Sequence, residues 1–280
     1  MQNLQTLIDL LTYNRNIHIS VVDLKGVLNT SAAKLEFKNI IHSMQFCCVA
    51  KSTERGYSVC LKCKKLANEK VINSKSPFSG HCIYGLYETA VPVVLDNDVV
   101  AIVYVGNAII NDCTTRNRIR QISAITNVSE QSLLSQLNQC EYIKTSDELY
   151  QVGEIVVDYI KMLCSRNRTD ESKNNWIVNL MKRYANESFC YNVSLKEFSV
   201  DHRRNEKYIG RLFKKETGKT FSEYCMDLRL NKAENALQQS DALIIDIAYE
   251  CGFNNISYFN KVFKKKHGIT PIQYRKEMNR

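Results

Sequence analysis

The stretch IIDIAYECGFNNISYFNKVFKKKHG, residues 244–268, decides the fold of the C-terminal part of this 280-residue chain. Ile244, Ile247 and Ala248 recur at helical spacing and predict a short helix. Gly252 then supplies the permissive backbone that a tight turn between two helices requires. The stretch therefore predicts two short helices joined by a tight turn.

The second helix of this stretch has an apolar and a polar face. Phe253 fills the turn before it, and Asn254 or Asn255 is expected to cap its first turn. Its predicted buried face comprises Tyr258, Phe259, Val262 and Phe263. Its outward face comprises Ile256, Ser257, Asn260 and Lys261, with Lys264–Lys266 just beyond. A short helix with polar and basic side chains beside a glycine turn is typical of a helix that enters the major groove of DNA.

A second stretch, SLKEFSVDHRRNEKYIGRLFKKETG over residues 194–218, repeats this design. The inner face of its first helix is predicted to contain Leu195, Phe198 and Ser199. Asn205 is the expected cap of its second helix, whose core side comprises Tyr208, Ile209, Leu212 and Phe213. The predicted outward positions are Lys207, Gly210 and Arg211. Between the units, Leu230, Ala233 and Leu237 form one helical stripe, so the chain beyond Trp176 is predicted to be all helical.

Residues 176–280 resemble the AraC/XylS family of bacterial transcription regulators across the whole two-unit module. The motifs that carry the resemblance are Arg211, Phe213-Lys214, Gly218, Arg229-Leu230, Ala233, Ile247-Ala248, Gly252-Phe253, Ser257–Phe259, Phe263-Lys264, Gly268, Thr270-Pro271 and Tyr274-Arg275. The resemblance implies that the second helix of each unit enters a major groove. The expected DNA-contacting residues are Arg203, Arg204, Lys207, Arg211, Ile256, Ser257, Asn260 and Lys261.

The first unit departs from the family pattern in its turn. The family usually has alanine at Ser199, glycine at Arg203 and apolar residues at His202 and Arg204, whereas this turn reads DHRRN. Gly210 also has no side chain with which to read a base. The geometry of this turn and the specificity of its unit are therefore open. Arg203 and Arg204 either contact phosphates, which position a protein without specifying sequence, or are ordinary solvated charges.

Charge and composition agree with this interpretation. The chain carries a net charge of +9, and residues 171–280 contribute 20 Lys and Arg against 13 Asp and Glu. A basic C-terminal part fits a module that neutralises DNA phosphates. The beginning of the chain shows no export signal, and the longest apolar stretches, such as Val99–Val105, are too short to span a membrane. With eleven cysteines in addition, we expect a cytoplasmic protein with reduced thiols and no membrane partner.

The N-terminal part is predicted to be an α+β sensory domain. Helices are expected around Leu4–Leu11, over Ala33–Met44 and over Ser58–Ile72. The expected strands are Ile17–Asp23, a short strand beginning at Val27, and a hairpin of Ala90–Leu95 with Val99–Gly106.

This part resembles the PocR sensory domain, a PAS-like ligand-binding module. The residues that carry the resemblance are Ser20–Asp23, Gly26, Phe46–Cys48, Gly56, Cys60, His81–Leu86, Val91–Val93 and Gly106. The resemblance implies an apolar pocket for a small organic compound, with short diols or hydrocarbon derivatives as the suggested class. The implied pocket residues are Phe46, Cys48, His81, Cys82, Tyr84, Val91 and Val93.

The cysteines of this part leave an alternative. A metal- or thiol-based redox sensor could use Cys47, Cys48, Cys60, Cys63 and Cys82, and Cys60-x2-Cys63 has metal-ligand spacing, which makes Cys60, Cys63 and Cys82 the candidate ligands. Cys60 and Cys63 also fall on a helical stripe with Val59, Leu66 and Ala67, and free cysteine often behaves as a small buried apolar residue. Buried core thiols are the favoured interpretation.

A helix is predicted between the two parts. Leu149, Val152, Val156, Tyr159 and Leu163 follow each other at spacings of three and four residues. The helix is either packed on its own domain or serves as a dimer-forming, signal-carrying element. The polar run Ser165–Asn175 is the expected linker. The predicted domains are residues 1–144, a connecting segment 145–175, and residues 176–280.

No motif indicates catalysis. The sequence lacks a P-loop, G-x-G-x-x-G, H-E-x-x-H and G-x-S-x-G, so no catalytic residues and no cofactor are expected. The predicted function is a sequence-specific transcription regulator whose DNA binding or activation is controlled by a small organic ligand. Its expected partners are operator DNA, that effector, RNA polymerase and a second copy of the chain.

Overall fold

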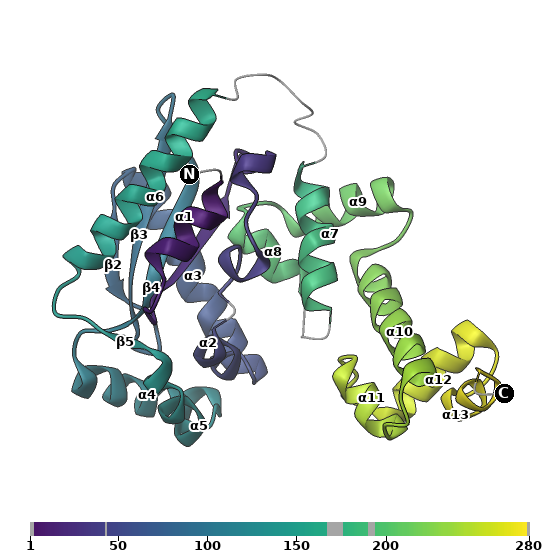
Figure 1. Cartoon of the computed structure of the whole chain (residues 1–280). Coiled ribbons are helices and arrows are strands. Elements are labelled where there is room, and N and C mark those ends of the chain that lie inside the picture. The colour runs from purple at the N-terminus through teal and green to yellow at the C-terminus, as the bar shows by residue number, and fades with distance from the viewer. Residues whose placement is uncertain (1–2, 43, 167–175, 190–193, 279–280) are drawn as a thin grey trace. The chain divides into compact units, whose positions relative to one another are not determined.

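The computed structural model describes residues 3–42, 44–166, 176–189 and 194–278 of the chain. It divides into two compact units, one formed by residues 1–176 with 200–203 and the other by residues 177–199 with 204–280. The α-helices, strands and 3-10 helices (η) of the first part are α1 (Leu4–Leu11), β1 (His18–Asp23), η1 (Ser31–Ala33), η2 (Phe37–Asn39), α2 (Gln45–Ala50), α3 (Glu54–Ser74), β2 (Phe78–His81), β3 (Tyr87–Leu95), β4 (Asp98–Ile109), α4 (Asp112–Thr126), α5 (Glu130–Ser135), η3 (Leu137–Gln139), β5 (Glu141–Tyr142) and α6 (Asp147–Arg166) (Figure 1). The helices that follow are α7 (Trp176–Ser188), α8 (Leu195–Asp201), α9 (Glu206–Thr217), α10 (Phe221–Gln239), α11 (Ile244–Glu250), α12 (Ile256–His267) and α13 (Pro271–Met278).

The first unit is built on a five-stranded sheet. Its strands pair in the order β1-β4-β3-β2 and are antiparallel, while β5 pairs with β4 in parallel. The predicted hairpin is confirmed: β3 and β4 are joined at Asp96 and Asn97, whose φ angles of 47° and 62° are positive as in a type I′ turn. Helices and an antiparallel sheet in one unit, followed by an all-helical unit, confirm the predicted fold class.

Two helices cover opposite faces of this sheet. α6 lies along one face, where a Cβ added at Gly153 would come within 2.7 Å of Val91 Cγ2 (Figure 1). α3 covers the other face, where Val71 packs in an apolar cluster with Ala90 and Tyr104. Adjacent strand residues point to opposite faces, which is why Val91 and Ala90 meet different helices.

The α6 seam is part of the core of its own unit. Leu149, Val156 and Leu163 are buried, and the helix packs against β3 and β4. Of the two interpretations of this helix, the structure shows packing on its own sheet. The predicted linker falls mostly outside the described residues, and the three-part division of the chain stays a prediction.

Two local predictions for the N-terminal part are wrong. No strand begins at Val27, because the Asp23 carboxylate accepts hydrogen bonds from four successive backbone N–H groups, those of residues 25–28, at 2.7–3.2 Å. Burial raises the pKa of Asp23, and these hydrogen bonds lower it in part. The described residues between 33 and 44 also form no α-helix: η1 ends at Ala33, η2 follows it, and Asn39 donates a 2.7 Å hydrogen bond to the Ile19 carbonyl of β1. Side-chain hydrogen bonds of this kind compete with regular structure.

The second unit is all helical, as predicted. An apolar cluster joins α10 to α11, α12 and α13 through Leu237, Ile247, Phe259, Phe263 and Tyr274. α10 begins with a capping box in which Thr220 and Glu223 bind each other's backbone N–H groups. Among the described residues, no helix is both long and apolar enough to cross a membrane.

Candidate functional site

The turn between α11 and α12 has the geometry of a tight helix-turn-helix. Gly252 adopts a left-handed conformation with φ of 86°, and its N–H donates to the Tyr249 carbonyl at 2.9 Å. The Phe253 N–H donates to the Ala248 carbonyl at the same distance. The Phe253 ring is buried against Phe259, with ring centroids 4.9 Å apart, so it fills the turn as predicted.

The turn between α8 and α9 has the same geometry despite its unusual sequence. Arg203, at the position of Gly252, adopts φ of 48°, and its N–H donates to the Val200 carbonyl at 3.3 Å. The Arg204 N–H donates to the Ser199 carbonyl at 2.9 Å, matching the bond made by Phe253. The turn is thus preserved although an arginine occupies its left-handed position. The two turns differ in length: the N-cap residue of the next helix, Asn205, is the second residue after Arg203, whereas Asn255 is the third residue after Gly252.

The second helices of both units begin and end alike. Asn255 caps α12 by accepting from the Tyr258 N–H at 2.9 Å, and Asn205 caps α9 by accepting from the Tyr208 N–H at 3.1 Å. Each helix ends at a glycine of positive φ, and each carries lysines in its last turn, where a positive charge favours the helix dipole. Part of the basic charge at these ends therefore has a structural explanation.

Most of the predicted DNA-contacting side chains lie on exposed positions. These are Arg203, Arg204, Lys207, Arg211, Ser257, Asn260 and Lys261. Ile256 differs, since it is partly buried against the apolar cluster of the second unit. Tyr208 and Tyr258 were expected in the core but are about half exposed, at 51% and 50%. Phe259 and Phe263, four residues apart, define the buried stripe of α12 and place Tyr258 at its edge.

Gly210 is a packing position of α9, which corrects the expectation that it faces outward. It is partly buried, and a Cβ added to it would lie 3.2 Å from Leu195 Cδ2 of α8. Its counterpart in α12, Asn260, is exposed. The outward face of α9 therefore has one side chain fewer than that of α12.

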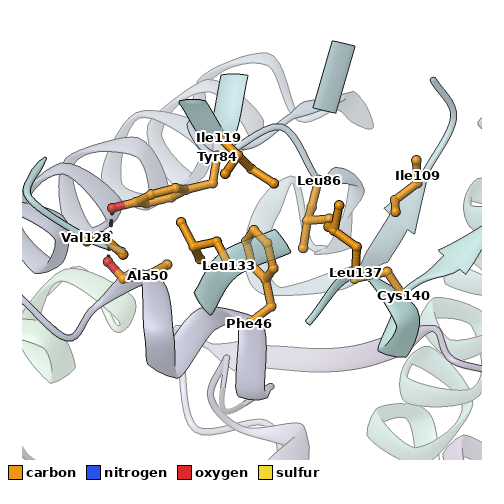
Figure 2. Close-up of a cluster of buried hydrophobic side chains, with 10 residues drawn as sticks. All are labelled: Phe46, Ala50, Tyr84, Leu86, Ile109, Ile119, Val128, Leu133, Leu137 and Cys140. Carbon is orange, nitrogen blue, oxygen red and sulfur yellow. Dashed lines mark hydrogen bonds between the residues drawn. The ribbon is translucent and has the colours of Figure 1, made fainter. Parts of the chain in front are cut away.

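The residues predicted to line a pocket in the sensory unit do not form one group. Phe46 and Tyr84 lie in a buried apolar cluster with Leu86 and Leu133, their ring centroids 6.4 Å apart, and Figure 2 shows this packing. Cys82 packs against the same cluster. The Tyr84 hydroxyl donates to the Ala50 carbonyl at 3.0 Å, so its hydrogen bond is made within the core.

The remaining predicted pocket residues lie elsewhere. Val91, and with it Val93 two residues on, faces α6 on the other side of the sheet from α3. His81 is partly exposed and contacts the Tyr87 ring at 4.9 Å, and Cys48 is partly buried in α2. Val91 and Val93 therefore lie on the face of the sheet that α6 covers, apart from the cluster against which Cys82 packs, and the composition of the ligand pocket stays a prediction.

The structure gives no support to the metal or redox alternative. No group of three or more His, Cys, Asp or Glu side chains in the described part of the chain is placed to hold a metal ion. Burial raises the pKa of Cys47 to about 12, and it raises the pKa of Cys63 and of Cys82 as well. Thiols of high pKa are weak nucleophiles at neutral pH, which fits their role as core side chains.

Sequence reasoning missed a set of polar side chains between α3 and the sheet. Burial raises the pKa of Glu88 on β3 to about 7, partly offset by the nearby Lys64 ammonium. Asn68 is buried, and its Oδ1 accepts from the Tyr104 hydroxyl at 2.5 Å. The available signal was Asn68 itself, because a polar residue on the stripe of α3 that also contains Leu61 and Val71 interrupts its apolar pattern.

Known families match both parts of the chain. The family described as "Sensory domain found in PocR" matches residues 1–167, more than half of the chain. The family described as "Helix-turn-helix domain" matches residues 203–277.

Proteins of similar sequence are named as helix-turn-helix transcriptional activators. The HTH-type transcriptional activator RhaR of Mannheimia succiniciproducens is 30% identical over 158 residues, which are 55% of this chain and 57% of that protein. RhaR of Enterobacter sp. is 27% identical over 152 residues, or 51% and 52%. The chain thus spans about half the length of the curated relatives it matches.

Solved structures match the C-terminal part. The C-terminal domain of the response regulator yesN from Fusobacterium nucleatum is 32% identical, with a TM-score of 0.34 and coverage of 35% of this chain and 95% of that chain. The C-terminal domain of AraT, a response regulator from Geobacillus stearothermophilus, is 28% identical, with a TM-score of 0.35 and coverage of 36% and 84%. From its two matching families, the chain belongs to the AraC-type regulators that carry a PocR sensory domain.

Proposed function

We propose that this chain is a non-enzymatic transcription regulator that binds operator DNA through α9 and α12 and is controlled by a small organic ligand in its sensory unit. The observation that carries the DNA part is the duplicated turn. Two helices of 12 residues follow turns with matching hydrogen bonds, and both present polar and basic side chains outward. Because its proposed target is chromosomal DNA, the protein is expected to act in the cytoplasm.

The helices α9 and α12 are proposed to contribute unequally to the recognition of DNA sequence. On α12, Ser257, Asn260 and Lys261 are exposed on neighbouring turns and can reach base edges. On α9, Lys207 and Arg211 are exposed, but the position between them is the packed Gly210. We expect α12 to supply most of the sequence information and α9 to supply mostly phosphate contacts.

Ligand control is the second part of the proposal. The matched family is a sensory domain, and α6, which packs on its central strands β3 and β4, is the last helix before the DNA-binding unit in chain order. A compound that changes the packing of this sheet is therefore positioned to act on the segment that continues into that unit. The relatives named as activators suggest the direction, and contacts with RNA polymerase and with a second copy of the chain belong to the same proposal.

The experiment selects binding sites for the full-length protein from randomised double-stranded DNA and then measures affinity for the selected and a scrambled sequence at fixed salt. We expect a defined site and a clear affinity difference, typically of 10³-fold or more for specific binders. Lys261→Ala is expected to reduce that difference. Recovery of no common sequence would contradict the DNA proposal.

A further inference from the structure

The face of α3 that covers the sheet carries polar residues in its middle. Leu61, Lys64, Asn68 and Val71 follow one another at helical spacing, and only the last of them packs in the apolar cluster with Tyr104. Asn68 is 3% exposed, and its Nδ2 has no hydrogen-bond partner among the described residues. A buried amide donor left unpaired is destabilising, so its presence calls for a partner.

The sheet presents a matching polar row to α3. His18 on β1 pairs with Gly106 on β4, and a Cβ added at Gly106 would lie 2.8 Å from the Cβ of Glu88 on β3. The adjacent row contains Ser20, paired with Tyr104, and the Ser20 Oγ is also buried without a partner in the part of the chain that is described. Two neighbouring rows of the sheet are thus polar on the side of α3.

His42, in the segment before α2, is a further member of this group of polar residues. Its ring meets the edge of Tyr104 at 5.5 Å and that of His18 at 6.1 Å. Its Nε2 is buried and has no hydrogen-bond partner among the described residues. Burial lowers the pKa of His42 well below its ordinary value, with a further contribution from the Lys64 ammonium, so the ring is neutral at neutral pH.

The exposure of these groups sets them apart from the core. Glu88, Lys64 and His42 are only partly buried, and none of them is a member of the apolar clusters around Val71 and Tyr84. Partly accessible polar groups beside the Asn68 Nδ2 and His42 Nε2 atoms, which have no hydrogen-bond partner in the described part of the chain, have the features of a binding site for a polar molecule.

We propose that His42, Lys64, Asn68 and Glu88 form the ligand site of the sensory unit, and that it takes a small neutral polyhydroxylated compound, a polyol or a monosaccharide. Each hydroxyl both donates and accepts, which suits a site that offers the Asn68 amide, an imidazole nitrogen and a carboxyl group. One ammonium and one carboxyl balance each other, so a ligand without net charge fits. This inference rests on the proposed sensory function and puts a polar site in place of the apolar pocket expected from sequence.

The test is calorimetric titration of the full-length protein. The probes are glycerol, xylitol, sorbitol and the common aldopentoses and aldohexoses, with 1-pentanol as the apolar comparison and gluconate and glucosamine as the charged ones. At least one neutral polyhydroxylated probe is expected to bind better than all three comparisons. His42→Phe retains the ring against Tyr104 but lacks Nε2, and it is expected to weaken binding tenfold or more while raising the melting temperature without ligand.

A matched pair on α3 separates the site from the helix. Asn68→Leu is expected to weaken binding at least tenfold, whereas Asn73→Leu, at an exposed position of the same helix, leaves it unchanged. Binding of none of the polyhydroxylated probes, or undiminished affinity in both His42→Phe and Asn68→Leu, overturns the proposed site and ligand class. If 1-pentanol then binds and changes DNA affinity, the sensory function stands with another ligand; if DNA affinity responds to no bound compound, the proposed function itself fails.

Discussion

At the scale of single residues, burial shifts the pKa values of several groups in the sensory unit more than neighbouring charges do. Glu88 carries a carboxyl whose pKa is raised to about 7 by burial, while the pKa of His18 and of His42 is lowered by the same cause. Both effects favour neutral groups. The Glu88 carboxyl and the two imidazoles are therefore shifted toward their neutral forms, which are suited to hydrogen bonding.

The Glu88 pKa makes stability depend on pH. A carboxyl whose pKa is raised on folding contributes no penalty below its unfolded value near 4.5, and it destabilises the protein progressively as pH rises through about 7. Glu88→Gln removes this penalty. Relative to the original protein, the variant is expected to gain about 1–3 kcal/mol of stability between pH 4.5 and pH 8, measured by thermal melting at each pH. Glu69→Gln on α3 controls for the loss of one carboxylate; a constant difference between the Glu88 variant and the original protein across this range would contradict the assignment.

Lys261 tests whether α12 reads bases. It is exposed beside Ser257 and Asn260, away from the buried Phe259 and Phe263. Lys261→Ala is expected to cost about 1–3 kcal/mol in binding to the selected site and less in binding to scrambled DNA. Lys265→Ala, in the last turn of the same helix, should weaken both to a similar extent. An unchanged ratio of the two affinities in Lys261→Ala would show that this lysine is not a reading residue.

At the scale of elements, the two helix-turn-helix turns show one geometry made by two sequences. Gly252 adopts the left-handed conformation without steric strain because it has no Cβ. Arg203 adopts the same conformation, with φ of 48°, although its Cβ is crowded against the backbone there. Gly252→Ala is expected to lower the free energy of unfolding of the second unit by about 1–2 kcal/mol. Arg203→Gly is expected to raise stability by up to about 1 kcal/mol, and calorimetry of the full-length protein measures both. A loss of stability in Arg203→Gly would mean that the arginine side chain stabilises the turn by more than its strain costs.

How well the elements could be predicted depends on how local their signals are. The α11–α12 unit and the β3–β4 hairpin were predictable because a positive-φ turn and an apolar period specify each of them. Residues 33–44 were not, because the Asn39 side chain binds the backbone of β1, a contact between distant segments. The faces of Val91 and Gly210 were missed for the same reason, since each is decided by a neighbouring helix.

At the scale of the whole molecule, the family could be recognised from sequence but the ligand site could not. The DNA-reading helices consist of contiguous residues, so their motifs carried the prediction. The proposed site joins His42 from a loop, Lys64 and Asn68 from α3 and Glu88 from β3, so its members come from three separate segments of the sequence. Only the paired register of β1, β4 and β3 brings His18, Gly106 and Glu88 into one row.

The central claim is that the chain couples a sensory site to DNA binding, and reciprocal linkage tests it most directly. The affinity of the full-length protein for its selected DNA site is measured with and without a saturating bound probe, and the affinity for that probe is measured with and without DNA. Both affinities are expected to change by the same factor, typically 5–150-fold, because linkage requires equal effects in both directions. Tight binding of both partners with neither affecting the affinity of the other would contradict it.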